Sequence, residues 1–175
     1  MKSKMLIMKR ILFSLLIALT AVSVSCTVKY SLSGASIPPD AKTFSVAYFP
    51  NNAPMVAPIL SATLTDELTQ RFASRTSLVQ VEEGGDFAFE GEIVGYSSTT
   101  SSVSSGDYAL QNRLTISVKV KFTNAIDDKM SFNKNFSAYA DYDSTKLLTE
   151  VESELIPQIV EQLVTDIFQA AASNW

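Results

Sequence analysis

The sequence predicts an α+β fold, a two-layer sandwich in which two helices pack on one face of a mostly antiparallel sheet of four to five strands. Apolar residues follow a helical period twice, over residues 58–74 and 145–172. The segments before and between them alternate apolar and polar residues, as strands do. No repeat or linker divides the 175 residues, and 46% apolar content is enough for a single core.

The first 25 residues have the pattern of a secretory signal. Four basic residues in the first ten precede an uncharged run over residues 11–24. This run is shorter than the roughly 18–20 apolar residues that a membrane-spanning helix needs. Translation could begin at Met1 or at Met8, and either start leaves the same mature chain.

Residues 23–26, Ser-Val-Ser-Cys, resemble a bacterial lipobox, in which small residues precede a cysteine that becomes the lipidated first residue of the mature protein. Ser23 departs from the usual leucine. Cys26 is the only thiol, and a lone thiol in this place has few other uses in an oxidising compartment. The alternative is an ordinary cleavage site with a chance cysteine. We therefore predict a lipoprotein signal peptide at 1–25, a lipidated tether at 26–42 and an α+β domain at 43–175.

The first strand and the first helix follow the tether. Residues 43–49 alternate, with Phe44, Val46 and Tyr48 on one side, and the Pro-Asn-Asn-Ala-Pro run at 50–54 ends the strand. The helix predicted at 58–74 has an apolar stripe at Leu60, Leu64, Leu68 and Phe72.

Four further strands are expected. A short strand at 78–81 turns through Gly84-Gly85-Asp86 into a strand at 86–97, and strands at 113–123 and 130–142 continue as a meander. One face of the 86–97 strand carries Phe87, Phe89, Gly91, Ile93 and Gly95. The serine-rich segment at 97–107 has little apolar surface to bury, so it is either a solvated loop or a partner-binding loop.

The final helix, predicted at 145–172, carries the second apolar stripe. Thr149 and Glu152 have the spacing of a capping box. Pro157 removes a backbone donor inside the helix and predicts a kink or a break into two helices. Seven positions on the apolar faces of these elements are predicted core: Leu64, Leu68, Phe89, Val118, Leu155, Leu163 and Ile167.

Composition excludes several classes of function. With no histidine and one cysteine, the chain cannot build a Ser-His-Asp triad, a Cys-His dyad, a His-ligated metal site or a Cys-rich zinc cluster, and we expect no cofactor. The leader takes four of the 14 basic residues and none of the 18 acidic ones, which leaves 10 against 18, a net −8. Such a chain is not expected to bind nucleic acid through its overall field.

Local patterns supply the candidate site residues. Lys119 and Lys121 share the polar side of one strand with Arg113, which suggests either a phosphate-binding row or a solvated face with edge-protecting lysines. Glu90 and Glu92 could pair with these lysines across the sheet.

Three loop residues, Asn51, Asn52 and Ser102, are candidates for partner contact. Asp141 and Asp143 fit a turn and a helix start better than a calcium site, because the spaced ligands of a calcium loop are missing.

Four short motifs, together with the order of elements, resemble the LptE family of outer-membrane lipopolysaccharide-assembly lipoproteins. These are Phe-Pro-Asn-Asn-Ala-Pro at 49–54, Phe-Glu-Gly-Glu-Ile at 89–93, Asn-Arg-Leu-Thr-Ile at 112–116 and Ala-Asp-Tyr-Asp-Ser at 140–144. The resemblance covers nearly all of residues 26–175. It implies a non-enzymatic plug and assembly aid inside the lipopolysaccharide-translocon β-barrel, an LptD-like partner. Some members of the family also bind lipopolysaccharide directly.

The place of the anchor follows from lipoprotein sorting. An Asp after the lipidated cysteine retains lipoproteins at the inner membrane, and acidic runs can send them to the cell surface, but Thr27-Val28-Lys29 has neither. We therefore expect a lipid anchor in the periplasmic leaflet of the outer membrane. The alternatives are a generic periplasmic binding or adhesion lipoprotein and an enzyme that uses carboxylate pairs alone.

Overall fold

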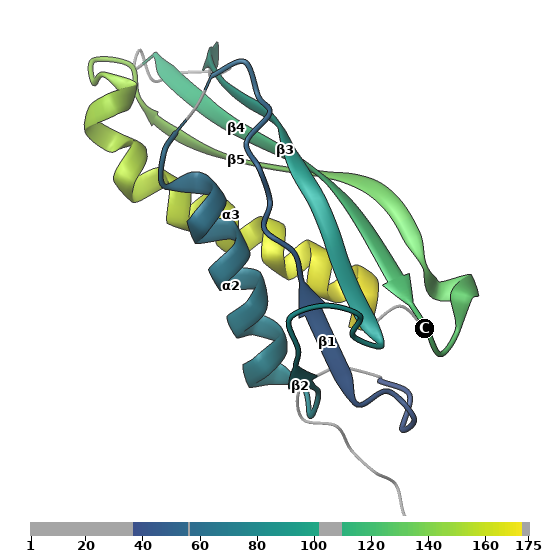
Figure 1. The fold of residues 1–175 in the computed structure, drawn as a ribbon. Helices are drawn as coiled ribbons and strands as arrows, with labels where there is room; N and C mark the ends of the chain where they lie inside the picture. Colours follow the sequence, from purple (N-terminus) through teal and green to yellow (C-terminus); the bar gives the residue numbers. More distant parts are fainter. Residues whose placement is uncertain (1–36, 56, 102–109, 173–175) are drawn as a thin grey trace, which may run out of the picture. The chain divides into compact units, whose positions relative to one another are not determined.

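A computed structural model of the chain describes residues 37–55, 57–101 and 110–172. These residues form a five-stranded sheet and two long helices, which confirms the predicted α+β class (Figure 1). The predicted anchor Cys26 and the loop residue Ser102 lie outside the described residues. The elements are β1 (Thr43–Val46), α2 (Leu60–Arg75), β2 (Val79–Gln80), β3 (Phe87–Ser101), β4 (Gln111–Asn124), the 3-10 turn η2 (Asp128–Met130), β5 (Phe132–Asp143) and α3 (Leu148–Ala172).

The strand order β2-β1-β3-β4-β5 makes the sheet mixed. Strands β3, β4 and β5 form the predicted antiparallel meander, whereas β1 is parallel to both β2 and β3. The turn at 84–86 does not join neighbouring strands, because β1 lies between β2 and β3. Helix α2 provides the crossover that parallel pairing of β1 and β2 requires. Gly85 passes so close to β1 that a Cβ on it would lie 2.5 Å from the backbone of Phe44.

Two inward positions differ from the simple alternation. Strand β1 ends at Val46, so Tyr48 is 64% exposed and Phe49 enters the core instead. In β3 the register shifts between Ile93 and Gly95, which indicates a bulge at Val94. The extra residue reverses the side-chain parity, so Tyr96 is buried in place of the predicted Gly95.

The core lies between the helices and one sheet face. Phe72 of α2 is at its centre, with its ring 5.8 Å from Phe44 of β1, 4.6 Å from Phe89 of β3 and 5.0 Å from Phe168 of α3. All seven predicted core positions are buried. The helical stripes and the strand alternation therefore identified the buried faces correctly.

Helix α3 runs through Pro157 as one helix, so the predicted break into two does not occur. Pro157 lies on the exposed side, where water can satisfy the carbonyl that loses its donor, while Ile156 and Ile159 beside it are fully buried. The predicted capping pair is also wrong. Glu150 accepts a hydrogen bond from the Leu147 N–H at 3.1 Å, and Glu152 accepts one from the Tyr96 hydroxyl at 3.0 Å.

Candidate functional site

The candidate site is the open face of β3, β4 and β5, opposite the helix-covered face. The register aligns polar residues of the three strands in rows across this face. We call this surface the open face and define it by these rows: Glu90–Lys121–Asn133, Glu92–Lys119–Asn135, Gly95–Ser117–Ser137, Ser97–Thr115–Tyr139 and Thr99–Arg113–Asp141.

Arg113 is held by two neighbours on β5. Its Nε lies 2.7 Å from Asp141 Oδ1 and its Nη2 lies 2.9 Å from Asp141 Oδ2, a bidentate pair. The guanidinium carbon also lies 3.7 Å from the centre of the Tyr139 ring, within the range of a cation–π contact. The hydrogen bonds to Asp141 raise the pKa of Arg113 and lower the pKa of the Asp141 carboxyl. Arg113 is therefore already paired with an anion.

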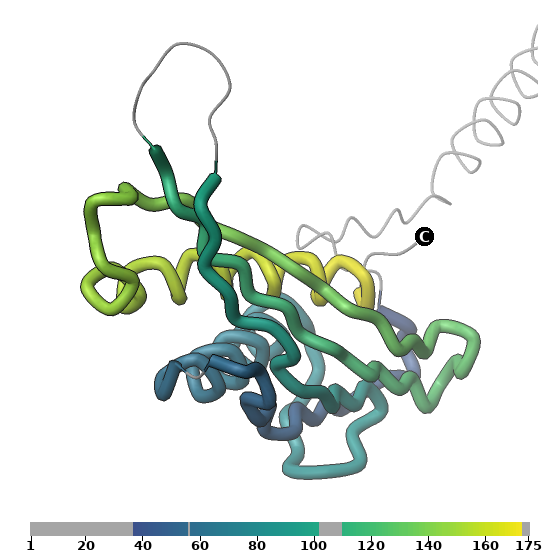
Figure 2. Tube along the Cα trace, turned by 90° about the horizontal axis from the view of Figure 1, so that it is seen from above, coloured from purple at the N-terminus to yellow at the C-terminus, as the bar shows by residue number. Residues whose placement is uncertain are grey.

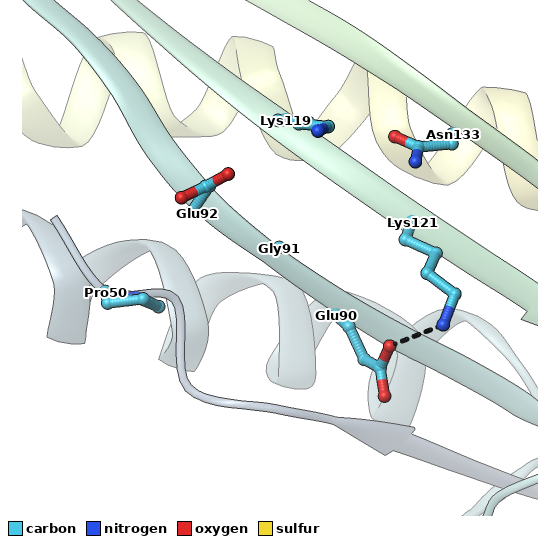
Figure 3. Close-up of a pocket in the computed structure, with 7 residues that line it drawn as sticks. All are labelled: Pro50, Glu90, Gly91, Glu92, Lys119, Lys121 and Asn133. Carbon is cyan, nitrogen blue, oxygen red and sulfur yellow. Dashed lines mark hydrogen bonds and ion pairs between the residues drawn. The ribbon is translucent and has the colours of Figure 1, made fainter. Parts of the chain in front are cut away.

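A shallow depression of about 320 Å³ lies at the other end of the open face (Figure 3). Lys121 Nζ donates to Glu90 Oε2 at 2.9 Å, which confirms one of the predicted cross-strand pairs, and Glu92 accepts from Asn52 Nδ2 at 2.7 Å. Among the described residues Lys119 forms no ion pair. The depression is lined by Pro50, Glu90, Gly91, Glu92, Lys119, Lys121 and Asn133, so its side-chain charges cancel.

The predicted basic row is thus divided into two clusters. Arg113 and Lys119 lie six residues apart on β4, which is about 20 Å along a strand. Sequence reasoning placed Asp141 in a turn and so missed it as the partner of Arg113. If residues are counted outward from the turn at 127–128 along both strands, residue 141 or its neighbour lies opposite Arg113. An error of one residue in this count moves a side chain to the other face, so the count alone does not identify the partner.

The predicted loop residues Asn51 and Asn52 pack along β3. Asn51 pairs with Ile93 through an isolated bridge, and its Oδ1 accepts a hydrogen bond from the Ala53 N–H at 3.1 Å. The Asn51 Nδ2 is buried with no hydrogen-bond partner among the described residues. Both asparagines therefore help to attach this loop to the sheet.

The other acidic candidates have structural partners. Asp143 accepts hydrogen bonds from the N–H and the hydroxyl of Thr145, which lower the pKa of its carboxyl. No group of three or more histidine, cysteine, aspartate or glutamate residues in the described part of the chain is placed to hold a metal. None of the described helices combines the length and apolar character that crossing a membrane would need.

A clasp joins the start of β1 to the start of β3. The Asp86 carboxylate accepts hydrogen bonds from the Lys42 N–H at 2.8 Å, and from the Thr43 N–H and hydroxyl at 2.9 Å each. These three donors lower the pKa of Asp86. The described chain therefore enters the sheet at the end where β3 begins, and the β3–β4 hairpin lies at the opposite end.

Comparisons with known proteins agree with this architecture. The model of the LptE family, described as lipopolysaccharide-assembly, matches residues 41–171. A hypothetical protein from Chlamydia trachomatis is similar with a TM-score of 0.51 and 10% identity, over 77% of this chain and 99% of that one. A protein from Xanthomonas campestris has a TM-score of 0.50 and 14% identity, over 76% and 87% of the two chains. No curated protein matches the sequence.

Proposed function

We propose a specific role for this chain, which belongs to the LptE family of lipopolysaccharide-assembly proteins. Within lipopolysaccharide assembly, it is a non-enzymatic lipoprotein that plugs the translocon β-barrel, an LptD-like partner, and assists its assembly. Cys26 carries the lipid anchor, and residues 26–42 tether the domain to the periplasmic leaflet of the outer membrane.

The observation that carries this proposal is the chemistry of the open face. Its rows contain hydroxyl, amide and charged side chains, and two of its cations are paired with carboxylates of the same face, Arg113 with Asp141 and Lys121 with Glu90. The lumen of an outer-membrane barrel is polar and hydrated. A face that is polar and internally neutralised suits such a lumen, because it leaves few unpaired charges to desolvate on contact.

The position of the tether supports an orientation for the plug. The fifteen residues of β3 span about 45–50 Å, from the clasp at Asp86 to the hairpin end at Ser101. Eleven residues, the number from 26 to 36, reach at most about 40 Å when fully extended. A plug anchored through Cys26 therefore presents the β3–β4 hairpin away from the anchored end and into the barrel.

A direct contact with lipopolysaccharide phosphates is proposed at Lys119. Arg113 and Lys121, the other two members of the predicted row, already hold carboxylates at 2.7 and 2.9 Å. Lys119→Gln should therefore weaken binding of purified lipopolysaccharide more than Arg113→Gln does. Equal losses for both variants, or no loss for either, would contradict this assignment.

The plug proposal is tested by site-specific photo-crosslinking in cells. A crosslinker at Tyr139, exposed on the open face, should capture the barrel far more strongly than one at Gln162, which is exposed on α3. Depleting the chain should lower the level of mature barrel and raise sensitivity to large apolar antibiotics. Normal barrel levels, with crosslinks only to other proteins, would favour a generic periplasmic binding or adhesion lipoprotein.

A further inference from the structure

The edge of β3 that faces away from β4 is paired only up to Ile93. The Ala47 N–H donates to the Phe89 carbonyl at 2.8 Å, and the Ile93 N–H donates to the Pro50 carbonyl at 2.9 Å. The Asn52 N–H then donates to the Ile93 carbonyl at 2.9 Å. Within the described ranges, no strand or bridge continues this pairing along β3 beyond Ile93.

Beyond Ile93, one face of β3 still packs against the fold, since Tyr96 is 3% exposed, whereas no described strand covers its outer edge. In Figure 2 the far ends of β3 and β4 are clearly separated from α2 and from the chain that follows β1. Strand β4 pairs with the other edge of β3 as far as Ser101, opposite Gln111. Residues 94–101 therefore form a strand with one satisfied edge and one free edge.

The register identifies which backbone groups lie on the free edge. In an antiparallel pair, successive residues direct their N–H and C=O alternately toward the partner strand and away from it. Phe89 and Ile93 direct their backbone groups away from β4, so the residues between them, Glu90 and Glu92, bond to Lys121 and Lys119 of β4. The register shift lies in β3 and not in β4, so residues 113, 115 and 117 of β4 bond to β3 in the same way. Their partners Thr99, Ser97 and Gly95 are thus paired. The backbone groups of Tyr96, Ser98 and Thr100 point to the free edge.

Such an edge has a specific chemical complement. Its donors and acceptors repeat about every 6.8 Å, which only the extended backbone of another polypeptide can match. Natural sheets usually block a free edge with lysine, proline or a cover, but residues 93–106 contain no charge and no proline. We propose that residues 96–100 of β3 bind an extended, uncharged segment of a partner polypeptide, which adds to the sheet as a sixth strand.

The occupant is assigned to the barrel protein, so this inference rests on the proposed function. Two copies of the chain joined only along this short edge would bury less than the roughly 1,200 Å² of a stable interface. A barrel that surrounds the chain contacts it elsewhere as well, so a barrel segment bound along this edge is one part of a larger interface. The side chains beside the edge on the open face are the hydroxyls of Ser97 and Thr99, which suit a polar, uncharged strand.

Hydrogen exchange on the free chain and on the co-expressed complex with the barrel tests the inference. The amides of Tyr96, Ser98 and Thr100 should exchange quickly in the free chain and at least ~10-fold more slowly in the complex. The amides of Ser97 and Thr99, which bond to β4, are the internal control and should be protected in both. A complex that forms while the edge amides keep exchanging quickly would overturn this inference and leave the plug role standing.

A pair of variants separates the edge donor from the side chain. Ser98→Pro and Ser98→Ala both lose the 2.6 Å contact of the Ser98 hydroxyl with Tyr142, but only the proline removes the edge N–H. Ser98→Pro should reduce barrel co-purification at least about fivefold relative to Ser98→Ala, with equal thermal melting of the two free chains. Equal co-purification would overturn the inference.

Two further outcomes also count against it. Edge amides that become protected in the free chain as its concentration rises would identify a second copy as the occupant. A wild-type chain that forms no complex with the barrel would overturn the plug role, and the assignment of the strand with it.

Discussion

The two faces of β4 differ sharply in burial and in chemistry. Leu114, Ile116, Val118, Val120 and Phe122 point to the helices, and each is at most 1% exposed. The alternate residues, from Arg113 to Lys121, form part of the open face and lie opposite polar residues of β3 and β5. The same backbone thus carries the stability of the fold on one side and a surface available for binding on the other.

The largest expected effect contrasts neighbouring residues on these two faces. Ile116→Ala should lower the free energy of unfolding by about 2–5 kcal/mol, because it leaves a cavity among fully buried side chains. Thr115→Ala, one residue away on the open face, should change it by less than about 0.5 kcal/mol. Denaturant unfolding of both variants measures the difference. Similar losses for both would mean that the open face is itself part of the core.

Leu163→Ala extends this test to the helix layer. Leu163 of α3 is fully buried, so its truncation should also cost about 2–5 kcal/mol in denaturant unfolding. Gln162→Ala, on the exposed side of the same helix, is the matched control and should be nearly neutral. A loss below about 0.5 kcal/mol for Leu163→Ala would place this helix face against solvent or a partner.

Two glycines of β3 provide a smaller contrast. A Cβ on Gly91 would lie 2.5 Å from the Phe49 ring and against the Lys119 carbonyl oxygen, whereas a Cβ on Gly95 would meet only the Ser117 side chain, at 3.1 Å, and its more distant N–H. Gly91→Ala should therefore cost about 1–3 kcal/mol through overpacking. Gly95→Ala should cost much less, because the small Ser117 side chain can shift. Thermal melting compares the two, and equal melting temperatures would show that β3 and the Phe49 loop can separate without cost.

The Arg113–Asp141 pair should contribute less than any of these. Both side chains are about one third exposed, so a double-mutant cycle with alanine should give a coupling free energy of at most about 1 kcal/mol. Added salt should reduce this coupling. A coupling of several kcal/mol would mean that the open face is structural, which would weaken its assignment to partner contact.

Acid should affect the clasp and leave the core unchanged. The folded-state pKa of Asp86 is lowered by its three donors, so its contribution to stability is present above the unfolded-state pKa, near 4, and is lost as pH falls through the lower folded-state value. Asp86→Asn should therefore melt at a lower temperature than the wild type at pH 7, and the gap should shrink toward pH 3. A gap that does not change with pH would show that the Asp86 charge has no part in the clasp.

Much of this fold could be predicted from the sequence because its signals are local. The helical stripe of Leu64 and Leu68 and the alternation along β4 each depend on residues within one element, and the structure buries the predicted side. The possible pairing of Lys121 with Glu90 could be foreseen because both lie on the polar side of neighbouring strands. The absence of histidine likewise excluded triad and histidine-metal chemistry, because composition alone decides whether such a site can be built.

What escaped prediction depends on contacts between distant segments. The position of β1 between β2 and β3 depends on which strands pair. The bulge at Val94 and the pairing of Arg113 with Asp141 depend on register, and a slip of one residue moves a side chain to the other face of the sheet. The free edge of β3 exists only because the chain leaves the sheet after Asn52. The sequence by itself determined which side of each element is apolar, since that is a matter of local spacing. Only the tertiary structure decided which elements lie side by side, because pairing is a competition among all the strands of the chain.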